Sequence, residues 1–172
     1  MELALTELFL AKWTDAIHDE WMNSLLAKRP DLRREKLART RETMNAAVPD
    51  CLVDGYQDLV ASLVLPDPDD RHVLAAAIRA GGTTIVTFNL QDFPTDALIP
   101  HGVAARHPDD FVTRLFEQNP VEVSSAIERQ RRRLQKPSKS REEFFATPAF
   151  QQLPEFLDSL RRFFSPPTAR EE

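Results

Sequence analysis

Apolar and polar positions follow two different periods along the chain. Within residues 15–28 the apolar side chains recur every four positions, as at Ile17 and Trp21, which predicts an amphipathic helix. Residues 83–88, TTIVTF, are β-branched and apolar on both faces, which is typical of a buried strand of a parallel sheet. The chain therefore mixes helices with short strands.

The other elements alternate in the same way as far as residue 118. Further helices are expected over 31–47, 68–80 and 108–118, and short strands over 9–13, 51–56 and 102–107. After residue 119 only helical segments follow. The alternation predicts an α/β fold with a mostly parallel sheet over 1–118, and a helical C-terminal extension over 119–172.

Composition and charge narrow the class of protein. The chain has 172 residues and is 42% hydrophobic, which is enough for a packed core. Its one cysteine, Cys51, excludes an internal disulfide, and no segment resembles a signal peptide or a membrane span, so a cytoplasmic protein is expected. The net charge of -5 divides into -7 over 1–112 and +2 over 113–172. The acidic part is suited to cations and the basic part to phosphate.

Three aspartates stand at the start of the predicted helix 68–80. Capping accounts for them, because acidic side chains are favourable at a helix N-terminus. Asp70 has a further property, since Val73 and Ala77 share its helical face and that face is apolar. A carboxylate there needs a cation or a hydrogen-bonding partner.

A second polar group follows the strand 83–88, in the sequence TFNLQDF. Asn89 and Asp92 either form a capped turn or contribute to a site. A helix and the strand after it run in opposite directions, so the start of the helix and the end of the strand lie at one edge of the sheet. We therefore expect Asp70 and Asp92 to converge. Glu20 borders the apolar stripe of the helix 15–28 and is a further candidate.

Three or four oxygen ligands without a matching Cys/His set favour Mg²⁺ or Mn²⁺ over zinc. Such sites usually serve phosphoryl chemistry, in which a metal-bound water attacks a phosphate. The sequence contains no nucleophile elbow, P-loop or dinucleotide-binding fingerprint.

Residues 65–94, LPDPDDRHVLAAAIRAGGTTIVTFNLQDFP, resemble the core of a PIN domain of the type found in VapC toxins. Residues 13–26 resemble the segment that carries the family's helix glutamate, and HPDDF resembles its last strand-to-helix junction. The resemblance extends over about 8–115. It implies a three-layer α/β/α sandwich around a parallel sheet, and a Mg²⁺/Mn²⁺-dependent endoribonuclease.

The resemblance also implies site residues and partners. Glu20, Asp70 and Asp92 match the family's metal-binding and catalytic acids, with Asn89 supporting them, whereas Asp67 and Asp69 do not match. Implied partners are an RNA substrate, a cognate antitoxin of a bacterial toxin–antitoxin pair, and a second copy of the chain, since relatives often form dimers.

The sequence departs from the family pattern at its start. A PIN domain opens with a strand that ends in a metal-binding aspartate, and MELALTELFL supplies neither, so the domain is expected to be incomplete at this end. Two hypotheses follow. One is the metal-dependent toxin ribonuclease, and the other is a catalytically inactive PIN scaffold that binds RNA or a protein partner.

A run of basic residues in the extension has two interpretations. It is either a solvated helix face with its linker, or an arm that contacts RNA phosphates. The run contains Arg129, Arg131, Arg132, Arg133, Lys136, Lys139 and Arg141.

Overall fold

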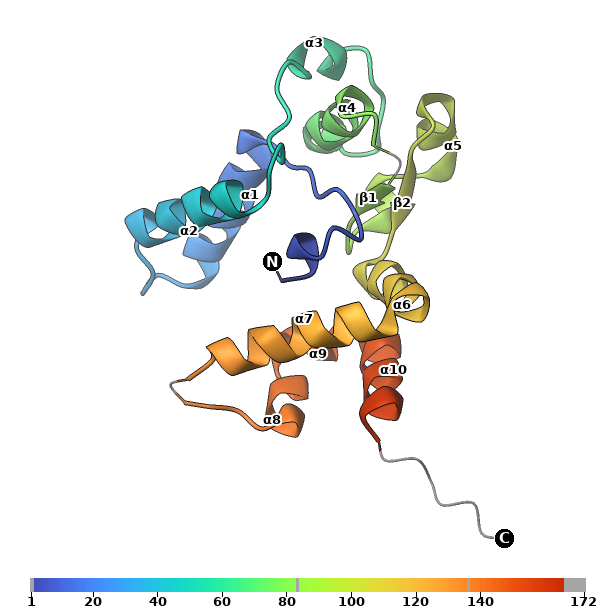
Figure 1. Ribbon diagram of the computed structural model, residues 1–172. Helices are drawn as coiled ribbons and strands as arrows, with labels where there is room; N and C mark the ends of the chain where they lie inside the picture. The colour runs from blue at the N-terminus through green and yellow to red at the C-terminus, as the bar shows by residue number, and fades with distance from the viewer. Residues whose placement is uncertain (1, 83, 136, 166–172) are drawn as a thin grey trace, which may run out of the picture. The chain divides into compact units, whose positions relative to one another are not determined.

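The computed structural model describes residues 2–165 apart from 83 and 136, and the chain divides into two compact units (Figure 1). The first unit is Leu3–Arg106, and the second begins at His107. The sequence places this boundary one helix later. The structure instead groups the helix that starts after His107 with the C-terminal helices.

The first unit contains short helices and two strands. Its elements in chain order are η1 (Glu2–Leu5, of which Glu2 groups with the second unit), α1 (Asp15–Lys28), α2 (Arg34–Ala47), α3 (Gln57–Val60), η2 (Pro68–Asp70), α4 (Arg71–Arg79), β1 (Thr84–Val86), η3 (Leu90–Asp92), α5 (Thr95–Leu98), η4 (Ile99–His101) and β2 (Ala104–Arg106). Among the described residues, no helix has the length and apolarity needed to cross a bilayer.

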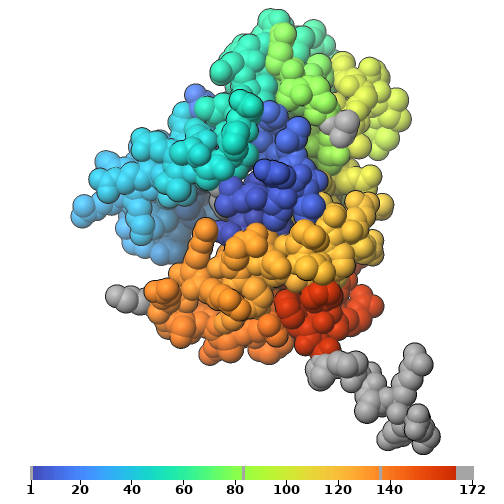
Figure 2. Space-filling view, viewed as in Figure 1, coloured from blue at the N-terminus to red at the C-terminus, as the bar shows by residue number. Residues whose placement is uncertain are grey.

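The first two helices differ in how they begin. α1 has the predicted bounds, and Thr14 caps it by accepting a hydrogen bond from the backbone N–H of Ile17 at 3.1 Å. α2 begins at Arg34, later than predicted, and the Asp31 carboxylate accepts hydrogen bonds from the Arg29 guanidinium and does not cap the helix. The mostly polar α2 forms part of the outer surface of this unit (Figure 2).

The sheet of the first unit is short and parallel. β1 pairs with β2 over three residues each, from Thr84 opposite Ala104 to Val86 opposite Arg106. The strands predicted over 9–13 and 51–56 are wrong in extent, because a single parallel bridge between Trp13 and Leu52 joins these segments. A parallel sheet fits the predicted α/β class. Among the described residues it has two strands, so the three-layer sandwich stays a prediction.

The core of the first unit lies between α4 and β1. Leu74 and Ala75 of α4 are buried, as is Ile85 of β1. Gly81 ends the helix with a positive φ of 61°, as the sequence predicts for a glycine after a helix C-terminus. The chain then turns back into β1, which begins at Thr84. Thr83 lies outside the described residues. The start of α4 and the end of β1 consequently face the same side of the unit.

The second unit is helical and rich in phenylalanine. Its elements are α6 (Pro108–Gln118), α7 (Pro120–Arg133), α8 (Arg141–Phe145), α9 (Pro148–Gln151) and α10 (Pro154–Phe164). Phe116 of α6 packs edge-on against Phe156 of α10, with ring centroids 5.9 Å apart. Phe144 and Phe145 are buried, whereas Phe163 is 45% exposed.

Replacing Ser140 by alanine should destabilise the second unit by about 1 kcal/mol, the usual cost of losing a helix N-cap. The Ser140 Oγ accepts from the Glu143 N–H at 3.2 Å, and the Glu143 carboxylate accepts from the Ser140 N–H at 2.7 Å. The latter hydrogen bond holds the pKa of Glu143 below its usual value. Urea denaturation measures the loss, and Ser140→Thr is the control because it keeps the hydroxyl. An equal loss in both variants would contradict the capping role.

Candidate metal centre

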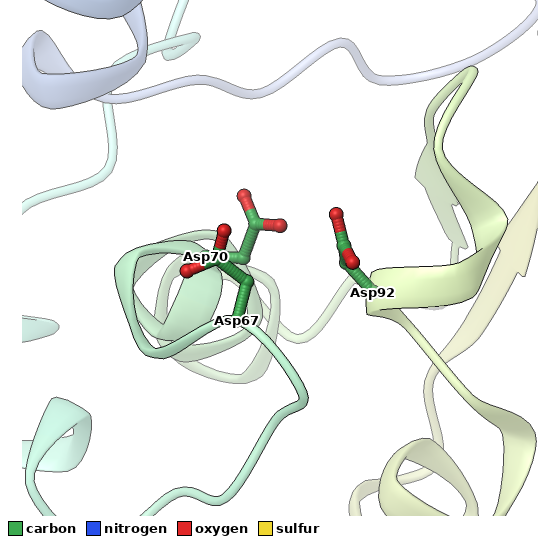
Figure 3. Close-up of side chains that lie close together, drawn as sticks. All are labelled: Asp67, Asp70 and Asp92. Atoms are coloured by element: carbon green, nitrogen blue, oxygen red, sulfur yellow. The ribbon is translucent and has the colours of Figure 1, made fainter.

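Three carboxylates of the first unit come together at the edge where α4 begins and β1 ends. Asp67, Asp70 and Asp92 each offer an oxygen, and these oxygens all lie within 4.8 Å of one another. Figure 3 shows Asp67 and Asp70 on the turn that leads into α4, with Asp92 across from them on η3. Among the described residues, this is where three potential metal ligands gather.

Local structure explains each position. Asp67 caps η2, since its Oδ1 accepts from the Asp69 N–H at 2.9 Å, and Pro68 follows at the first helical position. The cap uses Oδ1 of Asp67, so Oδ2 of the same carboxylate is available to a metal ion. Asp70 is the last residue before α4, and Asp92 ends the short turn after β1. The N-terminus of a helix and the end of a parallel strand thus supply the site.

The electrostatics of the cluster favour a cation. Partial burial raises the pKa of Asp70, and the charges of Asp92, Asp67 and Glu20 raise it further. Like charges in close proximity oppose ionisation unless a cation compensates them. The sequence predicts that Asp70 needs a cation or a partner, and its neighbours in the structure are themselves acids.

The donor set fits a hard divalent ion. Carboxylate oxygens are the ligands that Mg²⁺ and Mn²⁺ prefer, and the cluster contains no cysteine or histidine ligand of the kind that selects zinc. Three acids leave coordination positions for water and for substrate oxygens. The residues present therefore fit the metal that the resemblance implies.

The other two candidates adjoin this cluster in different ways. The Asn89 side-chain amide donates a hydrogen bond to Oδ2 of Asp92, which fixes the orientation of that carboxylate. Glu20 is not one of the three gathered acids. Its side chain is 55% exposed, and its Oε1 accepts a hydrogen bond from Nε2 of His72 at 2.6 Å. Its charge is nevertheless close enough to raise the pKa of Asp70.

Two residues that the resemblance does not select also lie in this region. Asp67 does not match the family's acids, yet the 3-10 turn η2 that follows it brings its carboxylate close to that of Asp70. His72 carries no ligand spacing in the sequence, yet it contacts Glu20 from 52 residues away. Its position two residues after Asp70 was the signal that could have singled it out.

Most of the basic run is engaged within the second unit. Glu128 accepts from Arg131 at 2.9 Å and from Arg141 at 2.8 Å. Burial opposes the ionisation of Glu128, but these hydrogen bonds outweigh it and hold its pKa below the usual value. Glu2, which groups with this unit, pairs with Arg129 and Arg133.

The three remaining residues of the basic run differ in their contacts. The Lys139 carbonyl accepts from Arg131 at 2.7 Å. Lys136 lies outside the described residues. Arg132 is exposed and has no side-chain partner among the described residues, so it is the arginine of α7 most available to a phosphate.

The match to a known family falls on the second unit. A family described as the VapC50 C-terminal domain matches residues 108–162, which run from the first residue of α6 into α10. A Mycobacterium tuberculosis protein named "Putative ribonuclease VapC50" is 53% identical over 58 residues, which are 34% of this chain and 34% of that protein. The matched part thus spans about a third of the relative's length. No solved structure matches the chain.

The family match begins within one residue of the boundary between the two units, which supports treating α6–α10 as one domain. The resemblance on residues 65–94 lies in the other unit. Both matches support the VapC-type family that the sequence predicts, and the second unit of the chain resembles the family's VapC50 C-terminal domain.

Proposed function

We propose that this chain is a Mg²⁺/Mn²⁺-dependent endoribonuclease that hydrolyses RNA phosphodiesters. The observation that carries the proposal is the convergence of Asp67, Asp70 and Asp92. Partial burial and the charges of the neighbouring acids raise the pKa of Asp70, so a bound cation would favour its ionised form, and the oxygen-only donor set suits the two ions named.

The residues have separable tasks in this proposal. Asp70 and Asp92 would hold the metal, and Asp67 would contribute its remaining oxygen. Asn89 orients Asp92 through its amide hydrogen bond. Glu20 acts at the rim of the cluster as a further carboxylate. When bound, the metal supplies a water that is more easily deprotonated and neutralises charge on the phosphate.

The proposal includes the finer features that the resemblance implies. The first unit would be a PIN-like three-layer sandwich, built on the parallel pair β1–β2. The chain would act in the cytoplasm as the toxin of a toxin–antitoxin pair, would bind a cognate antitoxin, and would form a homodimer. The similarity to a protein named as a VapC-type ribonuclease supports the proposed ribonuclease function.

RNA cleavage by the intact chain tests the proposal. We expect cleavage of a labelled single-stranded RNA with Mn²⁺ and none after EDTA treatment, with activity restored by excess Mn²⁺. Cleavage that persists in EDTA would overturn the metal-dependent mechanism.

A second candidate function is metal-independent binding of RNA or a protein partner. The observation in its favour is that the VapC50 C-terminal domain match covers the helical second unit, whereas the acidic cluster lies in the first. Binding that is retained in EDTA, together with absent cleavage at every Mn²⁺ concentration, would favour this function over the nuclease.

Arg132→Ala should weaken RNA binding modestly and flatten its salt dependence. In single strands each lost phosphate contact reduces the slope of log affinity against log salt by about 0.7. Fluorescence anisotropy in EDTA at several salt concentrations measures this slope. Arg114→Ala is the control, because Arg114 is engaged with Asp110 at 2.6 Å on α6. An unchanged slope for Arg132→Ala would exclude this residue from the RNA contact.

A further inference from the structure

His72 and Glu20 form an isolated polar contact in the first unit. His72 lies in the first turn of α4 and its side chain is 15% exposed, whereas Glu20 lies on α1 and is 55% exposed. A carboxylate oxygen only accepts, so at 2.6 Å the Nε2–H of His72 donates to Oε1 of Glu20. Among the described residues, Oε2 of Glu20 has no hydrogen-bond partner.

The other ring nitrogen argues against a role in stability. Nδ1 of His72 is buried and has no hydrogen-bond partner in the described part of the chain. A buried, unsatisfied nitrogen is unfavourable, so packing of α4 alone gives no reason for a histidine at this position. We therefore look to the hydrogen bond from Nε2 to Glu20 for the function of this histidine.

The position of the pair relates it to the acidic cluster. Asp70 lies two residues before His72, and the charge of Glu20 acts on Asp70. A side chain as exposed as Glu20 would sample many rotamers without a fixed donor. The hydrogen bond from His72 holds one oxygen of Glu20 and restricts where the other can lie.

We propose that His72 is a positioning residue, which fixes the Glu20 carboxylate at the rim of the metal site. The proposal rests on the proposed function, since it assumes that the cluster holds Mg²⁺ or Mn²⁺. Partners that hydrogen-bond to a metal-ligating side chain usually contribute 10–100-fold to metal affinity, and the proposal counts Glu20 among those ligands.

The test is Mn²⁺ affinity of the intact chain, measured by electron paramagnetic resonance of free Mn²⁺. We expect His72→Phe to weaken Mn²⁺ binding by about ten-fold or more, with an unfolding midpoint no lower than that of the parent chain. His72→Gln should restore most of the affinity, because its side-chain amide places a donor where Nε2 lies.

A double-mutant cycle tests whether His72 acts through Glu20. In a Glu20→Gln background, His72→Phe should have little further effect on Mn²⁺ affinity. An unchanged affinity in His72→Phe, or an equal loss in both backgrounds, would overturn the positioning role. If His72→Phe does not fold, His72→Asn replaces it, because its shorter amide cannot reach Glu20.

The outcomes separate this inference from the proposed function. If the parent chain binds no Mn²⁺, the metal site itself is wrong. If the parent chain binds Mn²⁺ and Asp70→Asn abolishes binding while His72→Phe leaves it unchanged, only the positioning role is wrong.

Discussion

Asp70→Asn is expected to reduce RNA cleavage by on the order of 10³-fold. A catalytic metal supplies several kcal/mol of transition-state stabilisation, and about 4 kcal/mol corresponds to this factor. Partial burial and the neighbouring acids raise the pKa of Asp70, and its carboxylate oxygen lies within 4.8 Å of those of both other acids. Single-turnover cleavage of a labelled RNA in Mn²⁺ measures the loss.

The same variant should change stability in opposite directions with and without metal. In EDTA, Asp70→Asn removes a repelled charge and should stabilise the first unit. In Mn²⁺ it should lose the stabilisation that binding gives the parent chain, about 2.7 kcal/mol at a metal concentration 100 times the dissociation constant. Asp69→Asn is the matched control, since Asp69 is exposed and outside the cluster. Equal effects of the two substitutions would refute the assignment of Asp70.

The pH dependence follows from the raised pKa of Asp70. Below the usual carboxyl pKa, both folded and unfolded chains hold the proton. As the pH rises from there through the raised pKa of the folded chain, the unfolded chain releases its proton first, so this contribution to stability is lost. Mn²⁺ binds the ionised form, so its stabilising effect should grow over the same interval.

Asp109→Ala is expected to destabilise the second unit by roughly 3 kcal/mol. The buried Asp109 carboxylate accepts from the N–H groups of Glu155 at 3.0 Å and of Phe156 at 2.9 Å, at the start of α10. Leu153, the residue before this helix, makes no side-chain cap, so Asp109 takes over that task from α6. Hydrogen bonds to a charged group are worth about 1.5–3 kcal/mol each, and a cap about 1 kcal/mol.

Hydrogen exchange on the intact chain locates the effect of Asp109→Ala. The amides of Glu155 and Phe156 should lose protection first, and the unfolding midpoint of the unit should fall. Asp110→Ala is the control, because Asp110 pairs with Arg114 in the manner of a surface ion pair, which is usually worth 1 kcal/mol or less. Comparable losses in the two variants would show that Asp109 is not the cap of α10.

The convergence of Asp70 and Asp92 could be predicted from the sequence because it depends on local direction alone. A helix that leads into a strand places its own start beside the end of that strand, whatever the rest of the fold is. The bounds of α1 and α6 were predictable for the same reason, since Thr14 and Pro108 act on neighbouring residues.

The features that the sequence did not reveal depend on geometry between distant segments. Asp67 does not match the family's acids, and only the 3-10 turn that follows it, η2, places its carboxylate beside that of Asp70. The contact between His72 and Glu20 joins two helices through residues with no common motif. Periodicity also cannot show that residues around Trp13 and Leu52 pair through a single bridge instead of extended strands.

The most direct test of the metal site is anomalous X-ray scattering at the manganese edge, from crystals of the intact chain grown with Mn²⁺. The account predicts an anomalous peak between the carboxylates of Asp67, Asp70 and Asp92, with oxygen ligands at about 2.1–2.2 Å, close to the distances of Mg²⁺. A well-ordered cluster with no peak, or a peak bound only at other residues, would contradict the metal-dependent nuclease.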